Sequence, residues 1–162
     1  MIQRVQTIFL LLTSVFYFSY WLFGLEWYEK GYPVIINVFN GSEYVNTILI
    51  SISFIPLIIS GISFVSIFIF KNRKSQIKLT QLSFRLSLVM SLFTIFYFYN
   101  CLSYLTELMP SKFLELLMYA AIVNPFLCCY LLFLALKYIK SCLLYTSPSP
   151  RDQRGSGLAA SG

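Results

Sequence analysis

Charged residues divide this chain into four long apolar runs. Three of the uncharged runs contain 21 residues and one contains 27: Val5 to Leu25, Tyr44 to Phe70, Leu86 to Thr106 and Leu116 to Leu136. A helix rises about 1.5 Å per residue, so 21 residues cover about 30 Å, the thickness of a bilayer's hydrocarbon core. The pattern predicts an all-α integral membrane protein with four transmembrane helices in an antiparallel bundle, spanning about residues 5–25, 44–70, 86–106 and 114–138.

The stretch between the first two runs, Glu26 to Glu43, is expected to be the longer outer loop. It contains two turn signals, Gly31-Tyr32-Pro33 and Asn40-Gly41. Residues 34–39 between them are rich in β-branched types, which favours a short surface strand. Five aromatic residues near the start of this loop are expected to lie at the level of the lipid headgroups: Tyr17, Tyr20, Trp21, Trp27 and Tyr28.

The second run carries a face of small and polar residues. Ser53, Pro56, Ser60 and Ser63 fall on one side of a helix. Small residues let helices approach closely in lipid, which favours packing against another helix, and a polar pathway is the alternative. Pro56 lacks a backbone N–H and is expected to bend this helix.

The third and fourth helices have their own markers. Lys78, Gln81 and Arg85 follow helical spacing, so the third helix is expected to start near Gln76. The fourth is expected to run from about residue 112 to 139 after a short turn. Asn124 precedes Pro125 inside it, which predicts a local kink.

The positions of the charged residues predict the orientation. One side would hold eight basic and no acidic residues before position 142: Arg4, Lys71, Arg73, Lys74, Lys78, Arg85, Lys137 and Lys140. The other would hold two basic and five acidic residues: Lys30, Lys112, Glu26, Glu29, Glu43, Glu107 and Glu115. Because Lys and Arg are enriched on the cytoplasmic side of membrane proteins, both termini are expected in the cytoplasm.

The connection between the second and third runs is the candidate binding surface. Its five basic residues are Lys71, Arg73, Lys74, Lys78 and Arg85. Three interpretations are open: a topology determinant, a surface for anionic lipid, or a docking site for a protein partner. Nucleic acid is not expected as a partner, because these residues lie beside lipid and lack interleaved aromatic residues.

Missing residue types exclude several kinds of chemistry. The chain has no His, and its one Asp is Asp152, in the last part of the chain. This excludes histidine haem ligands, Ser–His catalysis and histidine zinc sites. We therefore expect no catalytic, cofactor or metal site, and a protein that is not an enzyme. Ion-coupled carriers usually keep ionisable residues near the middle of the membrane, and the runs carry none.

The last 21 residues have a different character. Residues 142–152, CLLYTSPSPRD, read like a translated sequencing adapter. We expect residues 142–162 to be a disordered, non-native tail, and the natural sequence to continue differently after Ser141.

Three segments carry a resemblance to a known family. They are the opening MIQRVQ, residues 71–79 with the sequence KNRKSQIKL, and residues 135–140 with the sequence ALKYIK. Together they resemble the domain of unknown function 4293 family, small membrane proteins typical of Bacteroidota. The resemblance implies a four-helix inner-membrane protein whose natural C-terminus is truncated here. It implies no activity.

Two functions remain open from the sequence. The first is a non-enzymatic accessory or scaffold protein of the bacterial inner membrane that binds lipid or partner proteins, with a homo-oligomer possible. The second is a small oligomeric carrier or channel that uses Asn100, Asn124 and the polar face of the second helix.

Overall fold

The computed structural model describes residues 2–39, 41, 43–108 and 111–146, and these contain helices and turns but no strand. Its five helices are α1 (Ile2–Val38), α2 (Glu43–Ser53), α3 (Ile55–Phe68), α4 (Arg73–Glu107) and α5 (Lys112–Thr146). When α2 and α3 are taken together, these described residues form four helical segments that are long and apolar enough to cross a membrane.

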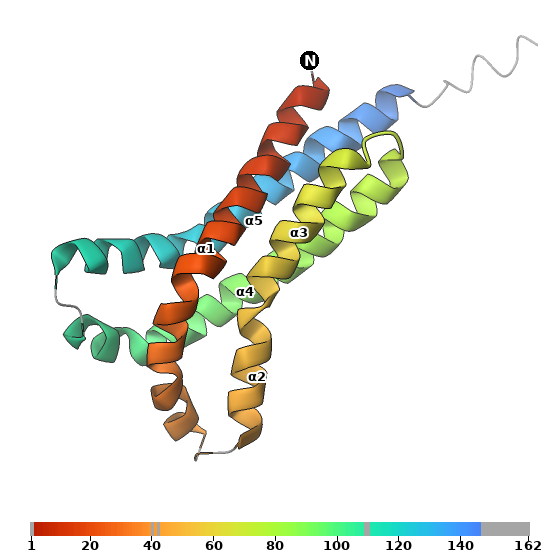
Figure 1. Ribbon diagram of the computed structural model, residues 1–162. Coiled ribbons are helices and arrows are strands. Elements are labelled where there is room, and N and C mark those ends of the chain that lie inside the picture. The colour runs from red at the N-terminus through yellow and green to blue at the C-terminus, as the bar shows by residue number, and fades with distance from the viewer. Residues whose placement is uncertain (1, 40, 42, 109–110, 147–162) are drawn as a thin grey trace, which may run out of the picture.

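The helices form a bundle at one end and separate at the other. α1 packs against α3 and α5, α4 packs against the same two helices, and α1 and α4 also touch each other. The start of α1, the α3–α4 turn and the end of α5 lie together at one end (Figure 1). At the other end, α1 and α2 form one hairpin and α4 and α5 form another, and the two hairpins diverge (Figure 1). Consecutive spans therefore run in opposite directions, as the apolar runs predicted.

The second span is broken near its proline, as predicted. α2 ends at Ser53 and α3 begins at Ile55, with Phe54 in a turn between them. Pro56 lies in the first turn of α3, where its missing N–H is tolerated. The Phe54 N–H donates to the Ser51 carbonyl, three residues earlier, at 3.3 Å.

The expected outer loop and strand are wrong. α1 continues through Glu26, Gly31 and Pro33 to Val38, so residues 34–38 are helical. Pro33 is exposed, whereas Tyr32 and Ile35 are buried in the core. Burial of this face outweighs the local turn and strand preferences. The turn itself is short and includes Gly41, whose φ of 73° favours glycine; Asn40 lies outside the described residues.

Helices α4 and α5 are longer than predicted. α4 begins at Arg73 rather than Gln76, because the Asn72 side chain caps it by accepting from the Ser75 N–H at 3.3 Å. α5 ends at Thr146, so the structure places residues 142–146 in this helix. The sequence from 126 to 147 has no Gly or Pro to end the helix. The rest of the expected tail, 147–162, and Pro110 lie outside the described residues.

Over residues 76–95 of α4, mainly polar residues face the interior of the bundle and large apolar residues are exposed. The buried face of α4 includes Gln76, Thr80, Ser83, Ser87, Ser91 and Thr94. Its exposed residues include Leu82, Leu88, Val89, Leu92 and Ile95. A water-soluble helix buries its apolar stripe, so this reversed distribution is the one expected for a helix that faces lipid.

Candidate functional site

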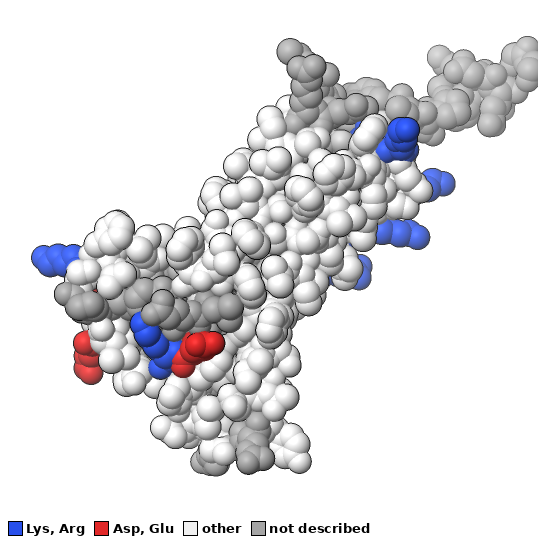
Figure 2. Space-filling model, viewed as in Figure 1, with Lys and Arg blue, Asp and Glu red and all other residues white. Residues whose placement is uncertain are grey.

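The predicted basic residues gather at the end of the bundle where the helices are packed together. We call this surface the basic end: the α3–α4 turn, the start of α4 and the last turns of α5, with Lys71, Arg73, Lys74, Lys78, Arg85, Lys137 and Lys140. In Figure 2 the Lys and Arg atoms at this end have no Asp or Glu atoms beside them, and the acidic atoms lie at the opposite end. All of these side chains except Arg73 are exposed.

Arg73 has a structural partner as well as a place on this surface. Its guanidinium donates to the Gln6 side-chain oxygen of α1 at 3.2 Å, and Gln6 is buried. Nearby along α4, the buried Gln76 amide donates to the Ser66 carbonyl of α3 at 3.1 Å. These two contacts tie α1, α3 and α4 together beneath the exposed lysines.

The small-residue face of the second span points into the bundle. Pro56, Ser60 and Ser63 are buried. The Ser60 hydroxyl donates to the Ser14 carbonyl of α1 at 2.9 Å, and the Ser14 hydroxyl donates to the Ser60 carbonyl at 3.1 Å. Ser63 donates to the Ser83 hydroxyl of α4 at 3.5 Å. Two of the predicted serines therefore contact two different helices.

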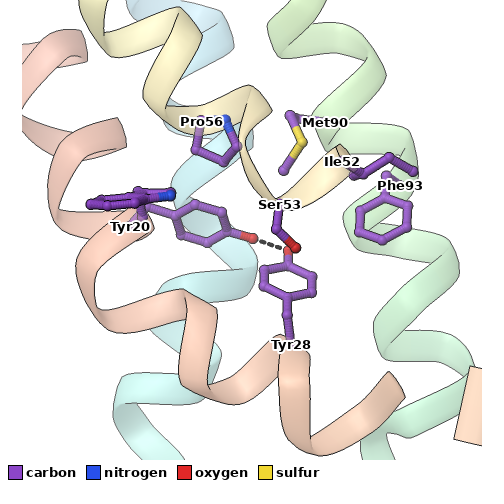
Figure 3. Close-up of a pocket in the computed structure, with 8 residues that line it drawn as sticks. Tyr20, Tyr28, Ile52, Ser53, Pro56, Met90 and Phe93 are labelled. Carbon is purple, nitrogen blue, oxygen red and sulfur yellow. Dashed lines mark hydrogen bonds between the residues drawn. The ribbon is translucent and has the colours of Figure 1, made fainter. Parts of the chain in front are cut away.

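Ser53, the fourth member of that face, belongs to a second site at the break between α2 and α3. We call it the hydroxyl cluster: Tyr20, Tyr28, Tyr32, Ser53 and Thr94. Tyr20 and Tyr28 are hydrogen-bonded through their hydroxyls, and Tyr32 is hydrogen-bonded to Ser53. Figure 3 shows the Tyr20 and Tyr28 hydroxyls meeting beside Ser53, with Pro56 and Met90 nearby.

Tyr32 lies beyond the Val5–Gly24 span. Burial raises its pKa above the ordinary tyrosine value. The phenol therefore stays protonated at neutral pH and is able to donate a hydrogen bond to Ser53.

Three of the aromatic residues expected at the level of the lipid headgroups have their side chains inside the bundle and not turned toward lipid. Tyr17, Tyr20 and Tyr28 are buried, with exposed fractions of 0%, 4% and 5%. Each has a hydroxyl partner inside the bundle; the Tyr17 partner is Ser87 of α4, at 2.6 Å. Their spacing along α1 places them on one broad face, which is the sequence signal that pointed inward.

Asn124 and Pro125 lie on α5 where it faces α1. Pro125 is buried, and α5 changes direction partway along its length, as the proline predicted (Figure 1). The Asn124 amide donates to the Phe16 carbonyl of α1 at 3.1 Å. Asn124 also lines an open groove of about 690 Å³ between α1 and α5, which is otherwise mostly apolar.

The structure does not bring the predicted polar residues into one pocket. The groove beside Asn124 contains none of Ser53, Ser60 and Ser63. Asn100 donates to the Phe96 carbonyl of its own helix at 2.8 Å. Among the described residues, no group of three or more His, Cys, Asp or Glu side chains is placed to hold a metal ion.

Comparison with known proteins identifies the family. The family profile described as "Domain of unknown function (DUF4293)" matches residues 2–141. No curated protein and no solved structure matches the chain. Because the match covers most of the sequence, including every helix up to the last turns of α5, the chain belongs to the DUF4293 family.

Proposed function

We propose that this chain is a multi-pass protein of the bacterial inner membrane, a non-enzymatic accessory or scaffold protein whose basic end contacts anionic lipid. The observation that carries the proposal is the basic end itself: exposed Lys and Arg at one end of a bundle whose outer face is apolar. The resemblance to small Bacteroidota membrane proteins supports the same location.

The length of α4 supports contact with headgroups. Its 35 residues extend over about 52 Å at 1.5 Å per residue, which exceeds a hydrocarbon core of about 30 Å. Lys74, Lys78 and Arg85 follow one another at intervals of four and seven residues, so they form one stripe along its first turns. With the apolar remainder of α4 in lipid, this stripe lies at the height of lipid phosphates.

The orientation follows from the same charges. Lys and Arg are enriched on the cytoplasmic side of membrane proteins, so the basic end faces the cytoplasm. Anionic lipid gives that surface of the membrane a negative potential. Each Lys or Arg near such a surface contributes about 1 kcal/mol. Neutralising two of them therefore costs about 2 kcal/mol, roughly a 30-fold loss of affinity.

Two matched double variants test lipid contact. One carries Lys71→Gln and Lys74→Gln at the basic end; the other carries Lys30→Gln and Lys112→Gln at the opposite end. Native mass spectrometry from mixed phosphatidylglycerol and phosphatidylethanolamine would measure the bound lipid. We expect the wild type to retain phosphatidylglycerol preferentially, the first variant to lose this preference and the second to keep it.

The outcomes separate the lipid from other partners. Equal retention of both lipids by the wild type, or equal loss in both variants, would contradict the proposal. Extraction from the host membrane adds a further test. A stoichiometric partner protein that is lost only in the first variant would assign the basic end to protein docking instead.

The alternative of a small carrier requires a polar route through the bundle. Ser60 and Asn124 instead donate to backbone carbonyls of α1, and the residues proposed for that route do not share a pocket. Hydrogen bonds of this kind hold helices together in lipid. This arrangement favours the accessory function over the carrier.

A further inference from the structure

A small cavity lies beside the break between α2 and α3. It has a volume of about 10 Å³ and is lined mainly by Tyr20, Trp21, Tyr28, Ile52, Ser53 and Pro56, with Met90 and Phe93 of α4 (Figure 3). A polar cavity needs on the order of 10–15 Å³ to hold one water, together with two to four polar partners. The volume of the cavity is therefore close to the minimum that holds a single water.

The directions of the surrounding hydrogen bonds show which polar atoms are available. The Thr94 hydroxyl donates to the Met90 carbonyl at 2.8 Å, so in its 3.4 Å contact with Tyr28 it is the acceptor. A hydroxyl has a single proton, so Tyr28 donates to Thr94 and must accept from Tyr20. The Tyr20 proton is then used, and the lone pairs of the Tyr20 oxygen remain available to accept a hydrogen bond.

The same reasoning applies to Ser53. The Leu49 carbonyl lies 3.0 Å from the Ser53 hydroxyl and 3.4 Å from the Tyr32 hydroxyl. The shorter contact assigns the Ser53 proton to this carbonyl, so Tyr32 is the donor in the contact between Tyr32 and Ser53. The Ser53 oxygen has two lone pairs, and one of them remains open. Tyr20 and Ser53 therefore both offer acceptors and no free proton.

Trp21 supplies the complementary donor. Its indole N–H is buried and has no hydrogen-bond partner among the described residues. Leaving a buried donor unpaired costs about 1–3 kcal/mol. The indole N–H is a donor only, so what it needs is an acceptor that can itself donate to Tyr20 and Ser53.

We propose that this cavity binds one water molecule, which accepts from the Trp21 indole and donates to the hydroxyl oxygens of Tyr20 and Ser53. One donor and two acceptors match the hydrogen-bonding capacity of a single water. The site adjoins Ile52, whose carbonyl lacks its usual helical donor because Pro56 has no N–H. Ordered waters satisfy backbone groups at such breaks inside membranes. The site is independent of the basic end and of lipid contact.

Selective NMR of the Trp21 indole tests this site. The chain has two Trp residues, so a Trp27→Phe background leaves one indole signal from ¹⁵N-labelled protein in lipid nanodiscs. A rotating-frame experiment would detect a dipolar cross-peak between the Trp21 indole proton and water. We expect this cross-peak in the background protein.

Two serine variants make the result specific. Ser53→Val removes one acceptor and places methyl groups at the cavity, so the cross-peak should disappear. Ser51→Val makes the same change at an exposed residue whose hydroxyl donates to the Thr47 carbonyl of its own helix. The cross-peak should persist in this variant. An absent cross-peak in the background protein would overturn the proposal. So would a cross-peak that survives Ser53→Val, because relay through tyrosine hydroxyls would then explain it.

Discussion

At the scale of single residues, Gly31 sets how closely α1 approaches α4. A Cβ atom at this position would overlap the Tyr97 hydroxyl and lie 3.2 Å from the Cys101 sulfur. The Tyr97 hydroxyl donates to the Tyr28 carbonyl of α1 at 2.9 Å, so it is not free to move away. Gly31 is required here by close approach, although glycine weakens a helix interior.

Gly31→Ala should therefore destabilise the protein. Overpacking of a tight core costs about 1–3 kcal/mol, to be measured by reversible unfolding in detergent. Gly61→Ala is the matched control, because nothing lies within 4 Å of a Cβ there. That variant should be neutral or more stable by up to about 1 kcal/mol, through higher helix propensity. Equal effects of the two substitutions would contradict the close contact.

Asn124→Leu distinguishes a packing role from a transport role. The variant loses the hydrogen bond to the Phe16 carbonyl of α1, and such bonds contribute about 1 kcal/mol in membranes. We expect lower stability in the same unfolding measurement. Asn100→Leu is the control, because its amide donates to the Phe96 carbonyl within its own helix, and its effect should be smaller. Loss of solute flux in liposomes by Asn124→Leu with unchanged stability would support the carrier instead.

The sequence predicted the positions of some residues and missed the contacts of others. The basic residues could be predicted because they lie close together in the sequence, between two apolar runs. The partner of Tyr17 could not, because Ser87 is 70 residues away and no local pattern joins them. The hydroxyl cluster was missed for the same reason: it combines residues of α1, α2 and α4.

At the scale of the elements, reciprocal hydrogen bonds join α3 to α1. Ser60 and Ser14 each donate to the other's carbonyl, and both are buried. Such a pair needs small side chains on both helices, because the backbones must come close enough for each hydroxyl to reach across.

Ser60→Val should weaken this contact. The substitution removes one donor and adds volume where the helices touch, so we expect a loss of about 1–3 kcal/mol. The exposed Ser51 of α2 provides the control, since its hydroxyl bonds the Thr47 carbonyl of the same helix. Thermal unfolding of Ser60→Val and Ser51→Val in detergent compares them. A shift for Ser51→Val as large as that for Ser60→Val would contradict the assigned contact.

Helix bounds were predicted unevenly, for physical reasons. The number of spans followed from charge spacing, which reflects the high cost of charges inside a membrane. The end of α1 could not be predicted in this way, because Gly31 and Pro33 are local turn signals. Gly31 lies against Tyr97 and Cys101, and contacts of this kind extend the helix to Val38.

At the scale of the whole molecule, the interior combines apolar side chains with hydroxyl and amide groups, the exterior is largely apolar, and the charged side chains of the described residues lie at the ends (Figure 2). Large apolar side chains are exposed along every helix, while hydroxyl and amide groups pair inside the bundle. In lipid, association relies on such packing and hydrogen bonds rather than on apolar burial. We therefore infer that the helices span a membrane with the basic end in the cytoplasm.

Cysteine labelling tests this claim most directly. In a background with the four cysteines replaced by Ala, Lys74→Cys marks the basic end, and Tyr44→Cys, at a residue 83% exposed, marks the start of α2. A membrane-impermeant maleimide is added to intact spheroplasts and to permeabilised ones. We predict labelling of Tyr44→Cys in intact spheroplasts and of Lys74→Cys only after permeabilisation. Labelling of both positions in intact spheroplasts, or the reverse pattern, would contradict the account.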